Sequence, residues 1–370
     1  MAGFSSDRCK EYSPIRDYAA IGDCHTAALV GRNGSIDWYC PGRFDAPAVF
    51  CRLLDAEKGG FFQLAPAEAS SSEREYRGAT NVLQTTFTTS SGQMRLTDFM
   101  ALEPRTRTRE GCDVAVSRRI LRLVEGLSGD IDVALQFRPT FDYARAGCEV
   151  SLVANVGAAA RAGKDTLILA CADVDLQPDG AGGLQGKMHI APGERRWVVL
   201  TCGNEGNDSR EALRPSGCDQ QLARTLSYWE HWAAHCTYQG PYRSEVLRSA
   251  LALKLLIYEP TGAIVAAPTT SLPEDIGGVR NWDYRYTWLR DTSLILYALM
   301  TIGYQAEAKD FLQWLRRTHE AEARSGLQIM YTVTGERDVR EMDLKHLNGY
   351  RCSRPVRIGN GAARQFQLDI

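Results

Sequence analysis

The sequence lacks any long apolar run. No stretch approaches the ~18 apolar residues that would suggest a membrane span, and the best candidate, 250–258, is interrupted by Lys254. The N-terminal segment 1–18 is rich in charged side chains and has no apolar core, so we expect no secretory signal there. We therefore expect a protein that does not associate with a membrane.

Paired cysteines and an excess of one charge are also missing. The 11 cysteines are scattered singly without a C-x-x-C pair, which excludes the common cysteine zinc and redox motifs. Such a pattern predicts reduced thiols and a cytoplasmic location. Because 43 basic residues balance 45 acidic ones, we expect no nucleic-acid partner.

A metal site is not indicated either. His231 and His235 lie four apart, a spacing at which two histidines can bind a metal. However, Trp232 stands where the metalloprotease pattern needs Glu, so interdomain packing is the better interpretation. We predict no metal and no cofactor.

The N-terminal half contains short β-rich runs separated by turn residues. Asn33-Gly34 predicts a tight hairpin, because this pair readily adopts positive φ. Similar signals predict hairpins that join 80–89 to 93–102, 117–125 to 130–138, and 184–190 to 195–202. The low-complexity stretch 157–163 is predicted to be a loop. Serial hairpins with few helical stretches predict a β-sandwich over 1–215.

A helical period replaces this pattern near Ser216. Leu222, Leu226, Trp229 and Ala233 share one helix face, which predicts a helical linker over 216–241. Further helices are predicted over 242–258, 288–302 and 306–323, with Thr287 capping the second of them. A short hairpin or an extended segment is predicted over 326–334. The helix over 242–258 is apolar on nearly all sides, which is typical of deep burial.

One segment, 281–291, concentrates aromatic rings, arginines and aspartates at the start of a predicted helix. Ring faces stack on the apolar face of a pyranose, and a neighbouring carboxylate and guanidinium form paired hydrogen bonds to its hydroxyls. A simpler interpretation is an aromatic core with an Arg–Asp ion pair on its edge. The residues alone leave both interpretations open.

Two flanking segments add weaker signals. The proline-bounded loop 266–275 would bring Glu274 and Asp275 towards that helix start, although a solvated acidic turn is the favoured interpretation of this loop. The glycine-bounded segment 349–360 gathers three arginines and is compatible with an anion or hydroxyl site.

Together these motifs resemble glycoside hydrolase family 15, the bacterial glucoamylase/trehalase-like proteins. The blocks 21–30, 34–38 and 43–45 are similar to the trehalase-like N-terminal domain, and 270–274, 281–291 and 354–360 to the early catalytic domain. The resemblance implies a β-sandwich followed by an (α/α)6 toroid, of which 242–370 would be only the first part. It also implies hydrolysis of α-glucosides, trehalose or malto-oligosaccharides, with inversion by two carboxylates about 6.5–9.5 Å apart.

The resemblance assigns sugar binding to specific positions but no catalytic residue. The matching residues are Tyr284, Trp288, Arg290, Asp291 and, at a further pocket position, Arg354. The general acid and base would fall beyond Ile370, so we expect a truncated chain that is inactive alone and self-associates through the open toroid edge. We expect no opposed catalytic pair among the carboxylates near the pocket, which are Glu274, Asp275, Asp283, Asp291, Glu336, Asp338, Glu341 and Asp343.

Two positions depart from the family pattern. Asn348 stands where an acidic residue is expected, and Cys352 where glycine is expected, which would cost strain if that position needs positive φ. Two other functions stay open: a non-catalytic carbohydrate-binding or regulatory protein derived from the family, and a disaccharide phosphorylase with the same architecture.

Overall fold

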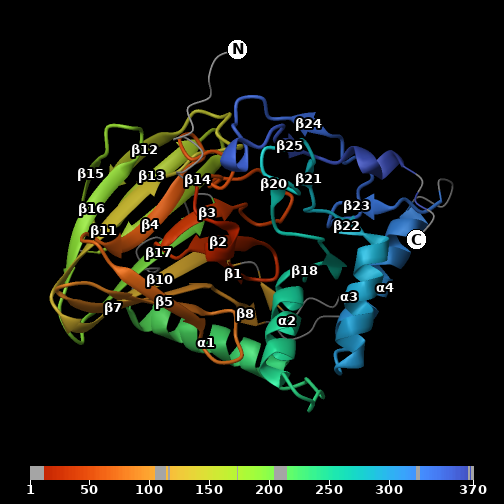
Figure 1. The fold of residues 1–370 in the computed structure, drawn as a ribbon, viewed down its shortest axis with the longest axis horizontal. Coiled ribbons are helices and arrows are strands. Elements are labelled where there is room, and N and C mark those ends of the chain that lie inside the picture. Colours follow the sequence, from red (N-terminus) through yellow and green to blue (C-terminus); the bar gives the residue numbers. More distant parts are fainter. Residues whose placement is uncertain are drawn as a thin grey trace.

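The structure, a computed structural model, describes residues 12–104, 114–115, 117–172, 174–203, 215–321, 326–365 and 367. A large β-rich N-terminal part is followed by a part with helices, which lies to the right in Figure 1. Among these residues, no helix has both the length and the apolar character needed to cross a membrane.

Two antiparallel sheets form the β-rich part. The first has the order β1-β2-β3-β4-β11-β16-β15 and the second β12-β13-β14-β17-β10-β7-β6-β5. The strands of the first sheet are Tyr18–Gly22, Ala27–Gly31, Ser35–Tyr39, Phe61–Pro66, Ile131–Arg138, Leu184–Ile190 and Asp175–Pro178 in that order. Those of the second are Glu149–Val153, Gly157–Ala162, Asp165–Cys171, Arg195–Cys202, Arg119–Gly129, Gly92–Met100, Leu83–Thr88 and Ser71–Tyr76. A short pair, β8 (Glu103–Pro104) and β9 (Val114–Ala115), lies apart from them.

The predicted sandwich is confirmed in its general form. One core cluster contains Phe62 and Leu64 of β4 together with Leu96 of β7 and Val124 of β10, so side chains of both sheets meet in one apolar layer. Arg122 also lies in this layer, fully buried, and forms an ion pair with Asp98 at 2.7 Å. Its guanidinium donates to the Phe62 carbonyl of the other sheet at 3.1 Å, so this polar group joins the two sheets.

The hairpin predictions are partly right. β2 pairs with β3 and β6 pairs with β7, as the turn signals indicate. The predicted pairing of 117–125 with 130–138 is wrong, because β10 pairs with β7 and β17 whereas β11 pairs with β4 and β16. The predicted pairing of 184–190 with 195–202 fails in the same way, since β16 and β17 belong to different sheets. At both places a short turn carries the chain from one sheet to the other.

The segment 157–163 also corrects the prediction. Residues Gly157–Ala162 form β13, paired with β12 and β14, rather than a loop. The side chains of 158–160 are buried, so this low-complexity stretch is part of the packed sandwich.

Helix α1 (Pro215–Ala233) covers the outer face of the second sheet and runs along the bottom of Figure 1. Leu222 and Leu226 pack with Phe99, Leu121 and Trp197 of that sheet. The helix ends at Ala233, so the last eight residues of the predicted linker, 234–241, are not helical.

Three further helices follow: α2 (Arg243–Leu255), α3 (Leu289–Thr301) and α4 (Ala306–Ala321). Trp232 of α1 stacks on Tyr304 between α3 and α4, with ring centroids 4.0 Å apart. The residue before α3 is Trp288 and makes no side-chain cap, so the predicted Thr287 cap is wrong. The segment 326–334 contains the short strand β23 (Met330–Tyr331), which pairs with the distant β22 (Thr287–Trp288), so of its two predictions the extended segment is confirmed and the local hairpin is wrong.

Short elements complete this part. The remaining strands are β18 (Ile257–Tyr258), β19 (Ala263–Ile264), β20 (Thr270–Pro273), β21 (Asn281–Asp283), β24 (Met342–Asp343) and β25 (Arg357–Ile358). Single 3-10 turns are formed by Ile15–Asp17, Tyr350–Cys352 and Gly361–Arg364. β20 and β21 pair with each other, and β24 with β25, so the segments 270–291 and 341–365 are held side by side.

Candidate functional site

A cavity of about 540 Å³ opens where β21, the start of α3 and the segment 360–367 meet. We call it the aromatic cavity, because Trp282, Tyr284 and Trp288 line it. Its polar lining residues are Glu274, Arg280, Arg290, Asp291, Glu341, Asn360, Gln365 and Gln367. Four of the five predicted sugar-binding residues, Tyr284, Trp288, Arg290 and Asp291, therefore lie together.

The rings differ in their exposure. Trp288 is 5% exposed and Tyr284 is 36% exposed, with ring centroids 5.8 Å apart and planes tilted by 44°. Burial raises the pKa of Tyr284, and the nearby Glu274 adds to this effect, so its hydroxyl stays protonated at neutral pH. The site thus has an aromatic wall and a phenol that can donate a hydrogen bond.

Each carboxylate in the lining is matched with an arginine. Asp291 accepts from Arg290 at 2.9 Å, Glu274 from Arg280 at 2.7 Å, and Glu341 lies 3.3 Å from Arg357. An ionised carboxylate only accepts hydrogen bonds and a guanidinium only donates them. Adjacent groups of this kind suit vicinal hydroxyls, each of which donates and accepts.

Arg354 does not belong to this group. It is exposed, lies outside the cavity lining and donates to the side chain of Asn348. At the position where an acidic residue was expected, the Asn348 side chain is thus the acceptor for Arg354. Cys352 adopts a φ of 64°, so the position where glycine was expected does have left-handed backbone.

Sequence reasoning overlooked Trp282 and Arg280 as lining residues. Trp282 is half-buried between the buried Asn281 and Asp283, since side chains in β21 alternate between two faces. The same alternation places Trp282 and Tyr284 towards the cavity. The two-residue period of the segment is therefore the sequence signal that could have identified Trp282 as a lining residue. Arg357 lies over the Trp282 ring at 4.3 Å and supports it from behind.

The buried pair Asp283–Arg285 holds the site against the sandwich. Arg285 binds both oxygens of Asp283, at 2.8 and 2.6 Å, and both side chains are almost completely buried. The same guanidinium donates to the Ala46 carbonyl at 3.0 Å and to the Tyr143 hydroxyl at 2.6 Å, both in the β-rich part. Asp283 accepts from the Gly359 amide and its carbonyl accepts from Asn360, which lines the cavity.

The two histidines of α1 lie elsewhere. Both His231 and His235 are exposed, and their rings contact each other edge to face at 5.0 Å. His235 is hydrogen-bonded to the His231 carbonyl. Within the described ranges, no group of three His, Cys, Asp or Glu side chains is placed to hold a metal ion.

Comparison with known families assigns both parts of the chain. Residues 8–229 match the trehalase-like N-terminal family, and residues 240–370 match glycosyl hydrolases family 15. The chain therefore belongs to the trehalase-like proteins of glycoside hydrolase family 15.

Individual relatives agree with this assignment. The chain is 36% identical to a trehalase of Thermoplasma volcanium over 379 residues, which is 100% of this chain and 57% of that protein. It is 37% identical to a trehalase of Mycobacterium tuberculosis over 391 residues, covering 99% of this chain and 56% of that protein. The chain thus spans little more than half the length of these relatives.

A solved structure supports the fold. A bacterial glucoamylase complexed with acarbose superposes with a TM-score of 0.60 at 12% identity, over 88% of this chain and 53% of that one. At this low sequence identity, the superposition shows a shared fold and nothing about function.

Proposed function

We propose that this protein is a trehalase-type glycoside hydrolase that acts on α-glucosidic bonds, with inversion, and that the aromatic cavity binds one glucose unit. The observation that carries the proposal is the cavity itself, where Trp288 and Tyr284 lie beside the adjacent pair Arg290–Asp291. Trehalase relatives along the chain support trehalose as the first substrate to test.

Roles within the cavity follow from the chemistry of the side chains. The Trp288 ring packs on the apolar face of the sugar, while Arg290 donates to its hydroxyls and Asp291 accepts from them. Inversion requires a general acid and a general base on opposite faces of the scissile bond. The three lining carboxylates are each engaged by an arginine, so we assign them to binding and name no catalytic residue among them.

The sequence boundaries are kept as part of this proposal. In this proposal residues 1–215 form the sandwich domain, 216–241 form the linker, and 242–370 belong to an (α/α)6 catalytic domain. Helix α1 ends at Ala233, so only the first part of the proposed linker is helical. The proposed location is the cytoplasm, which rests on the 11 cysteines being scattered singly along the sequence, a pattern expected of reduced thiols.

A binding experiment tests the proposal directly. Trp282 and Trp288 line the cavity, so trehalose binding should change the tryptophan fluorescence of the chain. Asp291→Ala should weaken binding by about tenfold or more, because a charged acceptor is lost. Asp338→Ala is the matched control, since Asp338 is exposed and pairs with Arg340 outside the cavity.

Two outcomes would contradict the proposed function. Equal trehalose affinity in wild type and Asp291→Ala, with both proteins folded, would remove this cavity from the proposed function. Equal affinity for the β-linked disaccharide cellobiose would contradict the proposed preference for α-glucosides.

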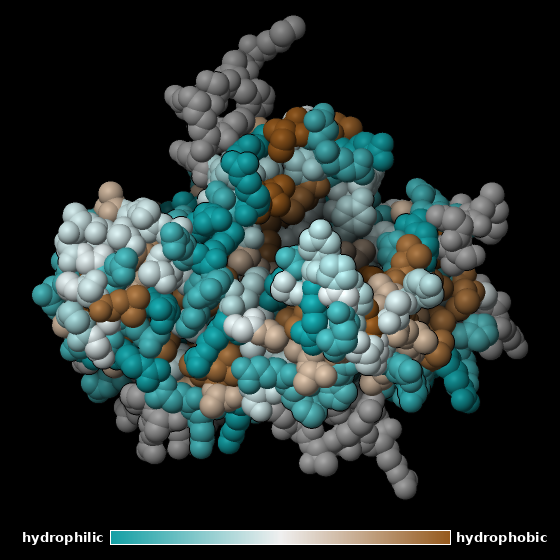
Figure 2. Space-filling model, turned by 60° about the horizontal axis from the view of Figure 1, so that its bottom comes forward, coloured by the Kyte–Doolittle hydropathy of each residue, from teal (hydrophilic) through white to brown (hydrophobic). Residues whose placement is uncertain are grey.

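We also propose that two copies of the chain associate through α3 and α4. Leu294, Tyr297 and Met300 are 65%, 74% and 50% exposed and follow one another at three-residue spacing on α3, while Leu312 of α4 is 62% exposed. Figure 2 shows brown side chains at the right of the view, the side on which these helices lie in Figure 1. No charged residue follows Asp291 in α3, which favours contact with an identical apolar face.

Sedimentation velocity over a range of concentrations tests this association. Leu294→Ser with Tyr297→Ser should shift the protein towards the monomer, whereas Leu152→Ser, an exposed leucine on β12, should not. A wild-type chain that stays monomeric at every concentration would contradict the proposal.

A further inference from the structure

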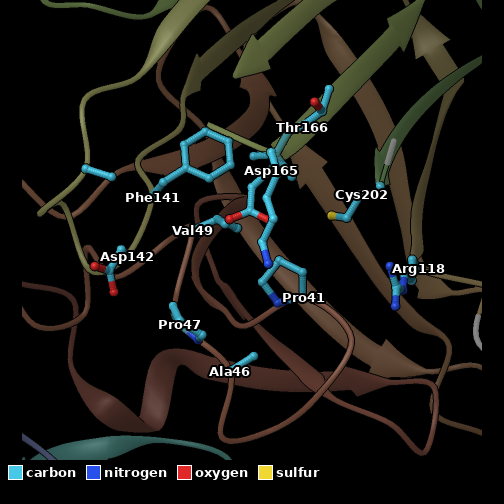
Figure 3. A pocket seen from close by; sticks show the side chains of 14 residues that line it. Pro41, Ala46, Pro47, Val49, Arg118, Phe141, Asp142, Asp165, Thr166 and Cys202 are labelled. Atoms are coloured by element: carbon cyan, nitrogen blue, oxygen red, sulfur yellow. The ribbon is translucent and has the colours of Figure 1, made fainter. Parts of the chain in front are cut away.

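A second cavity, of about 670 Å³, lies in the β-rich part and has no role in the function proposed above. We call it the sandwich cavity. It is formed by the loop after β3, the segment 141–146, the start of β10, the start of β14 and the end of β17 (Figure 3). These segments are distant from one another in sequence.

The lining combines apolar rings with charged groups of both signs. Phe141 and the rings of Pro41 and Pro47 supply apolar surface, and Figure 3 shows the Asp165 carboxylate directed into the space between them. Arg118 and Asp142 lie on opposite sides of the cavity in this view. The aromatic cavity has the same composition of rings, arginine and carboxylates.

One difference matters for binding. Among the described residues, neither Lys164 nor Asp165 forms an ion pair or a side-chain hydrogen bond, although both line the sandwich cavity. In the aromatic cavity each carboxylate already has an arginine partner. The donors of Lys164 and the acceptors of Asp165 are therefore available to a ligand without breaking an internal pair.

We propose that the sandwich cavity is a second saccharide site that takes a neutral mono- or disaccharide. Asp142 is already paired with Arg145 at 2.6 Å, so Arg118 and Lys164 supply the donors and Asp165 the acceptors that a ligand would meet, which favours a ligand that both accepts and donates hydrogen bonds. A sugar presents hydroxyls that both donate and accept, together with apolar C–H faces that fit the Phe141 and proline rings.

Binding stoichiometry tests this inference on the whole chain. Equilibrium dialysis with radiolabelled glucose, repeated with trehalose, should give two sites on the wild-type protein. Lys164→Ala with Asp165→Ala should weaken one site by about tenfold or more, because charged hydrogen bonds are lost. Lys187→Ala with Asp175→Ala is the matched control, since these are an exposed lysine and aspartate that lie opposite each other on β16 and β15 of the other sheet, outside the cavity.

Variants of the two cavities separate the two proposals. If Asp291→Ala removes one site and the Lys164/Asp165 pair removes the other, both proposals hold. A single site that is lost only in Asp291→Ala, or two sites that survive the Lys164/Asp165 change, would overturn the sandwich site and leave the proposed function intact. A single site lost only in the Lys164/Asp165 variant would support the sandwich site against the proposed function, and no binding of either sugar would overturn both.

Discussion

Replacing Arg285 by methionine should destabilise the folded chain strongly. The substitution leaves Asp283 buried, 0% exposed, without its charged partner, and removes the donors to Ala46 and Tyr143. Removal of one member of a buried ion pair costs about 3–5 kcal/mol in the free energy of unfolding. We expect a loss of that size in urea unfolding followed by circular dichroism.

The neighbouring ion pair supplies the control. Arg290→Met breaks the pair with Asp291, whose side chains are 34% and 32% exposed. A solvent-accessible pair contributes about 0–1 kcal/mol, so this variant should unfold close to the wild type. Both variants exchange the same residue types in the same short segment, but the Arg285 pair is buried and carries further hydrogen bonds to Ala46 and Tyr143.

A double variant separates the unpaired charge from the lost contacts. Asp283→Asn added to Arg285→Met removes the buried charge, so part of the stability should return. The reasoning is refuted if Arg285→Met lowers the free energy of unfolding no more than Arg290→Met does. It is also refuted if the double variant loses the full sum of the unfolding free energies lost by Asp283→Asn and Arg285→Met alone.

Two further buried ion pairs give predictions that rest on the same physics. Glu307 contacts Lys254 and accepts from Trp232; burial would raise its pKa, but these partners lower it below its ordinary value of 4.5. The stabilising contribution of Glu307 is therefore complete above pH 4.5 and is lost as the pH falls through the pKa of Glu307 in the folded chain. The difference in unfolding free energy between wild type and Glu307→Gln, measured by urea unfolding across pH, should thus shrink in acid. A difference that grows in acid would contradict this prediction. Asp98→Ala should cost about 3–5 kcal/mol in thermal unfolding because Arg122 stays buried, whereas the exposed-pair control Glu125→Ala should cost under about 1 kcal/mol; equal losses would contradict it.

The sequence indicated the sandwich but not its connections. A short glycine-containing turn after β10 or β16 is compatible with a hairpin, yet both turns pass the chain to the opposite sheet. Burial distinguishes a hairpin from a crossing to the other sheet. β10 is buried on both faces over most of its length, because the core between the sheets covers one face and the cluster with α1 covers the other. This depends on where α1 packs, and no local turn signal contains that information.

The candidate site was predictable to the extent that it is local. Tyr284, Trp288, Arg290 and Asp291 lie within eight positions, and the strand and helix periods bring them to one cavity. Arg354 was assigned from a distant segment, and the chain path from β24 to β25 turns it to Asn348 instead. The sequence also places Glu341 near the pocket and Asn360 in a possible binding segment, and both line the cavity because that same path brings them to it.

The segment 281–291 also shows why the two interpretations of its sequence both contain part of the answer. An aromatic core with an Arg–Asp ion pair describes Asp283, the last residue of β21, and Arg285 just beyond it, which are both buried and hold this segment against the sandwich. A polar group beside aromatic rings describes Arg290 and Asp291, which stand where the strand has ended and α3 begins. A period of two buries the first pair opposite Trp282, and the change to a helical period leaves the second pair accessible. The buried pair therefore positions the rings and the Asn360 side of the cavity, and the accessible pair lies where it can contact a ligand.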